Sequence, residues 1–410
     1  MSWKKVKIGD LCIIEKGAIG ILKAIPGEYP MVVTSEERKS HNEYQFDDEA
    51  VIIPLVSSTG HGHKSLKRIH FQKGKFAVGS ILCAVIPKNK AQLSAEYLYR
   101  FLDLNKENEL VARMKGMANV TLPMKEIAQI EIPLPPLNEQ NAFVEKHKNL
   151  ETQSTYLDTE LTHQLDLVKK LCQQFLQEAV QGKLIRNEEL EMRNTEGVGE
   201  TGAALLERIK AEKVKTGKKE KPLLPIKEDE IPFDIPDNWV WCRLGEIVHL
   251  SSGDGLTSHQ MNKEGKIPVY GGNGITGYHD GWNVEEDTIV VGRVGAYCGS
   301  IHLTQKFAWV TDNAFIVSYS KTNLNREFLI LLLKGAKLRE LSFDGSQPVI
   351  SGMRVYPKLV ALPPLSIQAQ IVSKVEELMG LCDALEAGIR ASKGVNEALL
   401  QQVLREALAG

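Results

Sequence analysis

A segment that occurs twice, 228 residues apart, constrains the fold of this chain more than any other feature. Pro135-Pro136-Leu137 recurs as Pro363-Pro364-Leu365, and matching residues keep that offset to the end of the chain. The last twelve positions of the two copies, 171–182 and 399–410, share seven identities. A fixed offset indicates that one structural element is used twice. The chain is therefore built on an internal duplication.

Each copy is predicted to be one long helix. The Pro-Pro pair ends the preceding extended segment, and Asn138 or Ser366 can cap the helix N-terminus. Gly182 or Gly410 stands where a C-cap belongs, and no proline interrupts either copy. About 44 residues at ~1.5 Å each give a helix of roughly 66 Å, a length typical of a coiled-coil spacer. Because the helices are copies, we expect them to pack antiparallel about a pseudo-twofold axis.

A weaker repeat precedes each helix. Trp3 and Lys7-Ile8-Gly9-Asp10-Leu11 resemble Trp239 and Arg243-Leu244-Gly245-Glu246-Ile247. Short β-rich runs follow in both regions, at 50–56, 81–86, 288–293 and 307–319, and each region then has a short helix, near 95–104 and 326–341. The predicted fold class is α+β: two α/β domains of similar frame, joined by two long helices packed as an antiparallel coiled coil.

The repeats also predict where the chain divides. The predicted divisions are a first domain at 1–132, a first helical spacer at 133–182, a charged linker at 183–236, a second domain at 237–360 and a second helical spacer at 361–410. Within the linker, Leu206-Glu-Arg-Ile-Lys-Ala-Glu-Lys213 predicts a short helix. We expect the rest to be extended and to carry the chain back along the helices to the second domain.

Composition is that of a protein with several globular cores. The chain has 410 residues, of which 43% are hydrophobic and 25% charged. Its most apolar stretch, Phe328–Leu333, is far shorter than the ~20 residues of a membrane helix, and no apolar leader follows Met1. We therefore expect a cytoplasmic protein without membrane contact. Its six cysteines form no C-x-x-C pair and should be reduced thiols.

Positive charge is concentrated between residues 50 and 95, although the formal net charge is -2. That stretch contains no acidic residue. Its basic residues are Lys64, Lys67, Arg68, Lys73, Lys75, Lys88 and Lys90. Such a run is typical of a surface that faces phosphates or of a solvated sheet face, and charge alone leaves both open.

In this order, the repeats and motifs resemble the specificity subunit of type I restriction-modification systems. The resemblance spans nearly the whole chain. It rests on Leu134-Pro-Pro-Leu-Asn-Glu-Gln140, its counterpart Leu362-Pro-Pro-Leu365, the Gln-Gln pairs near the helix ends and the linker phrase 206–213. In that family two target-recognition domains alternate with two helical regions. The predicted domains at 1–132 and 237–360 would be those target-recognition domains.

The resemblance implies a non-catalytic subunit that reads a bipartite, asymmetric site in double-stranded DNA. It also implies two kinds of protein partner, namely two copies of a methyltransferase subunit and the restriction/translocase subunits. S-adenosylmethionine, ATP and Mg are expected on those partner subunits and not on this chain.

The residues themselves agree that catalysis has no obvious place here. We find no Asn-Pro-Pro-Tyr methylation motif and no phosphate-binding loop. The glycine cluster at 292–299 follows a strand without opening a helix, so we expect a tight β-turn rather than a nucleotide site. His61, His63 and His70 have no acid or thiol spaced nearby, which favours turn or phosphate-facing histidines over a metal site. We therefore predict no catalytic, cofactor or metal residue.

DNA reading requires Arg or Lys for guanine and Asn or Gln for adenine, presented from loops that approach the bases closely. For any single residue, a turn facing solvent is the plainer alternative. The candidates in the first domain are Ser58, Thr59, His61, His63, Lys64, Lys67, Arg68 and Asn119. The candidates in the second domain are Tyr270, Asn273, Arg293, Ser346 and Gln347.

Two functions are consistent with these features. In the first, each domain reads a few base pairs and the helices fix the spacing between the two half-sites. In the second, the chain is a coiled-coil scaffold whose β-rich domains bind proteins or glycans without DNA contact. Loss of affinity with salt is expected only for the first, because phosphate contacts release counterions.

Overall fold

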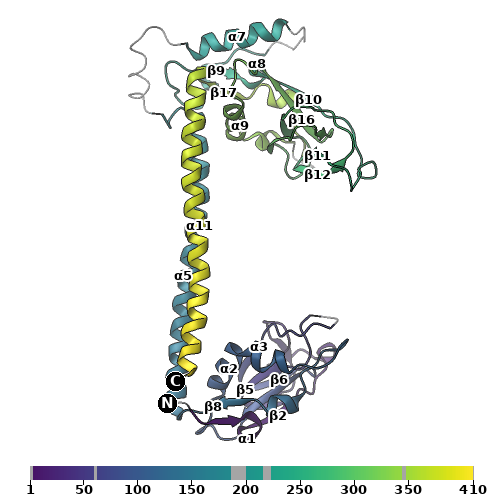
Figure 1. Ribbon diagram of the computed structural model, residues 1–410, viewed down its shortest axis with the longest axis vertical. Coiled ribbons are helices and arrows are strands. Elements are labelled where there is room, and N and C mark those ends of the chain that lie inside the picture. Colours follow the sequence, from purple (N-terminus) through teal and green to yellow (C-terminus); the bar gives the residue numbers. More distant parts are fainter. Residues whose placement is uncertain (1–2, 60–61, 186–199, 216–222, 344–347, 410) are drawn as a thin grey trace. The chain divides into compact units, whose positions relative to one another are not determined.

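The computed structural model describes residues 3–59, 62–185, 200–215, 223–343 and 348–409 (Figure 1). The chain divides into two compact units. Unit 1 comprises Met1–His163 with Ile389–Gly410, and unit 2 comprises Gln164–Gly388. Two long helices, α5 (Leu137–Val180) and α11 (Leu365–Ala409), each contribute one part to unit 1 and one part to unit 2. Each unit is thus a globular domain with a two-helix segment attached.

Unit 1 is built around one six-stranded sheet of order β2-β7-β5-β6-β3-β4. Its strands are β2 (Cys12–Lys16), β3 (Tyr29–Val32), β4 (Lys39–His41), β5 (Phe46–Pro54), β6 (His70–Val78) and β7 (Leu82–Pro87). Neighbouring strands are antiparallel except β3 and β6. Val51 and Ile53 enter one core while Ile52 enters another, as the period-two alternation of a strand requires. The sheet is therefore covered on both faces at β5.

Helices cover one face of this sheet and lead into α5. They are α1 (Ile8–Leu11), α2 (Ala95–Leu104), α3 (Lys106–Glu109), α4 (Met124–Ala128) and the 3₁₀ turns Ile21–Lys23 and Val111–Arg113. Helix α2 packs Leu98 and Leu102 into the same core as Val51 and lies between the sheet and α5 (Figure 1). Strand β1 (Lys5–Lys7) pairs antiparallel with β8 (Glu131–Pro133) just before α5.

Unit 2 repeats this plan with two smaller sheets. One has the order β10-β16-β13-β14, and the other has the order β12-β11-β15. Their strands are β10 (Val248–Ser252), β11 (Ile267–Gly271), β12 (Gly274–His279), β13 (Ile289–Gly292), β14 (Ile301–Leu303), β15 (Trp309–Val310) and β16 (Ala314–Tyr319). The helices are α7 (Gly202–Lys215), α8 (Leu244–Ile247), α9 (Arg326–Gly335), α10 (Gly352–Val355) and the 3₁₀ turns Glu228–Glu230 and Leu338–Leu341. Strand β9 (Val240–Arg243) pairs with β17 (Leu359–Leu362) just before α11, as β1 pairs with β8 before α5.

One buried glutamine in each unit joins the globular domain to its long helix. Gln140 accepts the Ser94 N–H at 2.8 Å and donates to the Gln92 and Pro135 carbonyl oxygens, both at 2.8 Å. Gln368 accepts the Asn325 N–H at 2.9 Å and donates to the Pro363 carbonyl oxygen at 3.1 Å. Ser94 and Asn325 are the N-caps of α2 and α9. The duplicated Pro-Pro-Leu motif therefore makes the same connection twice, because its glutamine ties the short helix to the start of the long one.

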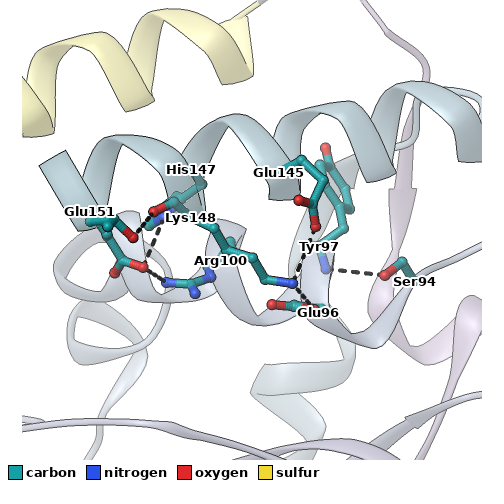
Figure 2. A network of polar contacts seen from close by, with 9 residues as sticks. Ser94, Glu96, Tyr97, Arg100, Glu145, His147, Lys148 and Glu151 are labelled. Atoms are coloured by element: carbon teal, nitrogen blue, oxygen red, sulfur yellow. Dashed lines mark hydrogen bonds and ion pairs between the residues drawn. The ribbon is translucent and has the colours of Figure 1, made fainter.

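Figure 2 shows the polar contacts that fix α2 on α5. Arg100 of α2 donates to Glu151 Oε2 at 2.7 Å, and Lys148 of α5 donates to Glu96 at 3.1 Å. Beneath these pairs the rings of Tyr97 and Phe143 meet edge to face with centroids 5.7 Å apart. The aromatic contact, worth about 0.5–1.5 kcal/mol beyond its burial, and the ion pairs, worth about 0–1 kcal/mol each where exposed, add to the Gln140 hydrogen bonds at this joint.

The two long helices pack antiparallel in both units. In unit 1, Asn396 donates to the Ser154 carbonyl oxygen at 3.0 Å and Lys393 pairs with Asp158 at 3.0 Å, so the numbering rises on one helix as it falls on the other. In unit 2 the Cys382 and Cys172 thiols meet across the helix pair, and burial together with that contact raises the pKa of Cys382 to about 11. All six cysteines are free thiols. These contacts confirm the predicted antiparallel coiled coil.

Two predictions about the long helices were only partly right. Gly182 does end α5, with φ +74° and a bond from the Lys183 N–H to the Glu178 carbonyl oxygen. Gly410 lies outside the described residues. Asn138 and Ser366 do not cap the helices, because α5 and α11 already begin at Leu137 and Leu365, directly after the prolines.

The predicted linker is wrong in its path. Helix α7 forms where a short helix was expected, but its Leu205 and Ile209 are fully buried in the core of unit 2. Buried Arg243 donates to the carbonyl oxygens of Leu224 and Pro225 and forms an ion pair with Glu230. Because the helices are antiparallel, the end of α5 already belongs to unit 2. The described part of the linker therefore wraps unit 2 and does not run back along the helices.

Candidate nucleic-acid interface

Two loops of unit 1 that lie far apart in sequence form one continuous surface. The Ser57 N–H donates to the Val120 carbonyl oxygen at 3.0 Å, and Val56 bridges to Thr121. This places the loop 57–67 beside the loop 115–121. The structure thus places the loop that carries Asn119 beside the loop that carries Lys64 and Lys67, although about 50 residues separate the two loops in the sequence.

The loop 115–121 is short and tightly closed. Lys115 and Thr121 exchange two backbone hydrogen bonds of 2.7 and 2.8 Å. Gly116 has φ +115°, and a Cβ there would come within 2.2 Å of the Asn119 carbonyl oxygen, so only glycine fits. Between these ends, Met117 projects with 93% of its surface exposed and Asn119 is also exposed. A rigid loop that presents an amide and a bare apolar side chain to solvent is suited to contact another molecule.

The loop 57–67 is held mainly by its own hydroxyl groups. The Lys67 N–H donates to Ser58 Oγ at 2.9 Å, and Thr59 Oγ1 lies 3.0 Å from Ser65 Oγ. Ser58 and Thr59 therefore shape the loop, whereas His63, Lys64 and Lys67 are exposed on it. His61 lies outside the described residues.

For most of the basic stretch 50–95 the structure favours a partly neutralised sheet face over one phosphate-facing surface. Acidic residues just before it, on β5, lie opposite its lysines on β6: Asp47 faces Lys75 and Glu49 faces Lys73. Lys90 pairs with Asp48 at 2.7 Å. Arg68 pairs with Glu36 at 2.9 Å, and Lys88 donates to the backbone carbonyls of Gly9 and Asp10. Within the described part of the stretch, Lys64 and Lys67 form no ion pair and face no acidic residue across a strand pairing, so they are the main candidates for phosphate contacts.

His70 is not a surface histidine. It is buried on β6, and Arg38 Nη1 lies 3.1 Å from its Nδ1. Burial, with the neighbouring Arg38 and Arg68 guanidinium groups, lowers the pKa of His70 to about 4. The expectation of a turn or phosphate-facing histidine is wrong for His70, because its side chain is buried on β6 beside Arg38.

Unit 2 has an open cleft of about 920 Å³, and of the candidate residues only Asn273 is among the described residues that line it. It is lined by three turns, 271–273, 294–297 and 311–313, together with the loop 255–261. Asn273 lies on its wall and is exposed. The predicted tight turn after β13 is confirmed, since β13 and β14 form an antiparallel hairpin around it.

Tyr270, one of the predicted DNA-binding residues, does not lie on the surface. Tyr270 is buried, and its hydroxyl accepts the Gln305 N–H at 3.2 Å, so it is a core residue. Arg293 is folded back over the Phe315 ring at 5.3 Å, with Nη1 3.5 Å from the Asp312 carbonyl oxygen. Arg293 thus supports the turn at Asp312. Ser346 and Gln347 lie outside the described residues.

Asp312 and Asn313 line the cleft, but they are not among the candidate residues predicted from the sequence. The sequence predicts one β-rich run at 307–319, but the structure has two strands in different sheets, β15 and β16, separated by the turn at 311–313. The Asp-Asn pair was the available signal, because these residues favour turns. The apolar residues on either side make the whole segment look like one continuous strand.

Over the described residues, no group of three or more His, Cys, Asp or Glu side chains is arranged to hold a metal ion. Within the same part of the chain, no helix has the length and apolar content needed to span a membrane.

A family model described as Type I restriction modification DNA specificity domain matches residues 1–167 and 236–392. The chain belongs to this family. The Type I restriction enzyme EcoEI specificity subunit of Escherichia coli is 27% identical over 300 residues, which cover 64% of this chain and 49% of that protein. The chain therefore spans about half the length of this curated relative.

Two solved structures share the fold. The HsdS subunit from Thermoanaerobacter tengcongensis aligns with a TM-score of 0.56 at 18% identity, covering 100% of this chain and 97% of that one. A chain from a study of complex assembly and conformational transition of the type I R-M system aligns with a TM-score of 0.63 at 16% identity, covering 100% and 98%. The family match confirms the resemblance drawn from the sequence, and the two alignments confirm the predicted fold class.

Proposed function

We propose that this chain is a non-catalytic DNA-specificity subunit that reads a bipartite, asymmetric site, one half with each unit. The observation that carries this proposal is a duplicated frame bearing two different sets of loops. Along that frame, α4 and β8 of unit 1 recur as α10 and β17 of unit 2 at the 228-residue offset, and Gln140 recurs as Gln368. The duplicated elements would hold the two DNA-reading domains in the same way. Because the loops of the two domains differ, the two half-sites would differ in sequence.

In unit 1 the reading surface is the joined pair of loops 57–67 and 115–121. Lys64 and Lys67 supply phosphate contacts and Asn119 supplies an amide of the kind that reads adenine. Exposed Met117 offers an apolar contact for a thymine methyl group or a base step. The loop 115–121 is closed by backbone hydrogen bonds before DNA arrives, so little ordering cost accompanies its binding.

The helices α5 and α11 set the distance between the two half-sites in this proposal. An unbroken helix converts residue number into length at ~1.5 Å per residue, and half-sites on one face of B-DNA recur about every 34 Å. The bases between the halves are then spanned without being read.

Partner docking is proposed for the long helices, because each unit exposes three aliphatic residues at corresponding positions on them. In unit 1 this set is Leu157, Val395 and Leu399, and in unit 2 it is the residues at the 228-residue offset, Leu385, Leu167 and Leu171. The seam of a two-helix pair is narrow and leaves Leu157, Leu385 and Leu399 in solvent.

Two equal exposed sets are the expected footprint of two copies of one partner, which we propose is the methyltransferase subunit. Restriction/translocase subunits would join the same complex. S-adenosylmethionine, ATP and Mg would be bound by those subunits, and the complex would act on DNA in the cytoplasm. Replacing Leu157, Val395 and Leu399 with serine should lower the methyltransferase count from two to one in native mass spectrometry.

The experiment for DNA reading is selection of duplexes from a random library by the full-length chain assembled with its methyltransferase. We expect two short motifs at a fixed gap, with affinity that falls as salt rises. The scaffold alternative predicts no motif and no such salt dependence. Absence of any enriched motif would overturn the proposed function.

A further inference from the structure

The cleft of unit 2 is formed by turns that touch through their backbones. A Cβ on Gly292 would lie 2.2 Å from the Gly272 carbonyl oxygen, and a Cβ on Gly272 would lie 2.5 Å from the Val294 carbonyl oxygen. Ser300 Oγ donates to the Gly272 carbonyl oxygen at 2.9 Å, and the Arg293 N–H donates to the Asn313 carbonyl oxygen at 2.8 Å. The three turns are thus locked to one another, and the side chains they carry hold fixed relative positions.

Three polar side chains on these turns have no partner within the described part of the protein. Over the described residues, no hydrogen bond or ion pair engages the side chains of Asn273, Asp312 or Asn313, and all three are exposed. Their backbones, by contrast, are tied down, since the Asn313 N–H reaches Thr311 Oγ1 and the Asp312 carbonyl oxygen faces Arg293. Exposed amide and carboxylate groups on a fixed backbone indicate that this cleft binds a polar ligand.

The lining excludes a phosphate role. Among the described residues that line the cleft there is neither lysine nor arginine, whereas Asp312 brings negative charge. A DNA backbone phosphate would be repelled there, so the fitting parts of DNA are base edges. Asparagine pairs with the N6 and N7 positions of adenine, and a carboxylate accepts from the cytosine N4 amino group.

We propose that Asn273, Asp312 and Asn313 are the base-reading side chains of unit 2, and that its half-site contains adenine, read by an asparagine, and cytosine, read by Asp312. Arg293 is a positioning residue, because it holds the Asp312 turn from behind. This inference rests on the proposed function and deepens it by naming the bases of one half-site.

The test is duplex selection and sequencing with the full-length chain assembled with its methyltransferase, using D312N and N313A. Each variant should change one half of the selected motif and leave the other intact. N313A should lose preference at one adenine position by about 5- to 150-fold, the discrimination of a good side-chain to base contact. D312N should lose its preference for cytosine, because an amide presents a donor as well as an acceptor.

Two controls separate the possible outcomes. E285Q neutralises an exposed carboxylate of unit 2 that does not line the cleft, and it should leave both halves unchanged. N119A, in unit 1, should alter only the other half. If the wild type selects a bipartite motif that D312N and N313A do not change, the inference is wrong and the proposed function stands. If the wild type selects no motif, both are wrong.

Discussion

Replacing Gln140 with leucine should destabilise unit 1 more than any exposed substitution on α5. Gln140 is fully buried and makes three hydrogen bonds of 2.8 Å to the backbone of Ser94, Gln92 and Pro135. Leucine keeps the bulk but leaves one N–H and two carbonyl groups without that partner, at about 1–3 kcal/mol for each group that stays dry. Partial rehydration reduces the sum, so we expect a loss of about 2–4 kcal/mol.

Native-state hydrogen exchange at the Ser94 amide is the direct assay, because Gln140 is its acceptor. A loss of 2–4 kcal/mol predicts exchange faster by about 30- to 1,000-fold. Tryptophan fluorescence would be dominated by unit 2, which holds four of the five tryptophans, whereas unit 1 holds only Trp3.

Two further variants make the test quantitative. Q368L removes only two such bonds from unit 2, so it should cost less, about 1–3 kcal/mol. Q153L changes an exposed glutamine on α5 and should stay within about 0.5 kcal/mol. Equal stability of Q140L and Q153L, or an unchanged Ser94 exchange rate, would refute the view that the duplicated glutamine joins domain and helix.

Two other outcomes follow from the structure. The pKa of His70 is about 4 in the folded protein and 6.5 in the unfolded chain, so as pH falls the unfolded chain binds a proton at this histidine first. The stability that neutral His70 contributes is therefore complete above about pH 6.5 and is lost as pH falls toward 4. H70N should remove that part of the pH dependence, on the order of 3 kcal/mol, in urea unfolding followed from pH 7 to pH 4.5, and an unchanged profile would contradict the assignment. K64A and K67A should each weaken binding to all duplexes alike and lower the slope of log affinity against log salt by about one, and a change in the selected sequence instead would mean that these lysines read bases.

The duplication made the long helices predictable. Pro135-Pro136 and Pro363-Pro364 mark where each helix starts, and Gly182 marks where one ends, because proline and glycine act through local backbone geometry. Contacts between distant segments were not predictable in this way. Whether Leu157 lies in the seam or in solvent depends on how the second helix is rotated against the first, and a single helix pattern does not contain that information.

The same limit of sequence-based prediction applies to the candidate DNA-binding surfaces. Lys64, Lys67 and Asn119 were recognisable by residue type and loop context, and the structure adds that their loops adjoin. The basic run 50–95 contains no acidic residue in sequence. In the fold, however, Asp47 and Glu49, which precede it, lie opposite its lysines across the β5–β6 pairing. Charge along a chain predicts a surface only when strand pairing is known.

The central claim is that the paired helices fix the gap between two half-sites, and a matched deletion tests it most directly. Removing residues 158–164 from α5 and the opposing 388–394 from α11 takes one heptad from each helix and preserves the phase of the seam. Seven residues correspond to about 10.5 Å, or about three base pairs of B-DNA. Duplex selection with this variant should return the same two half-site motifs with the gap shortened by about three base pairs. The same motifs at the original gap would contradict the claim.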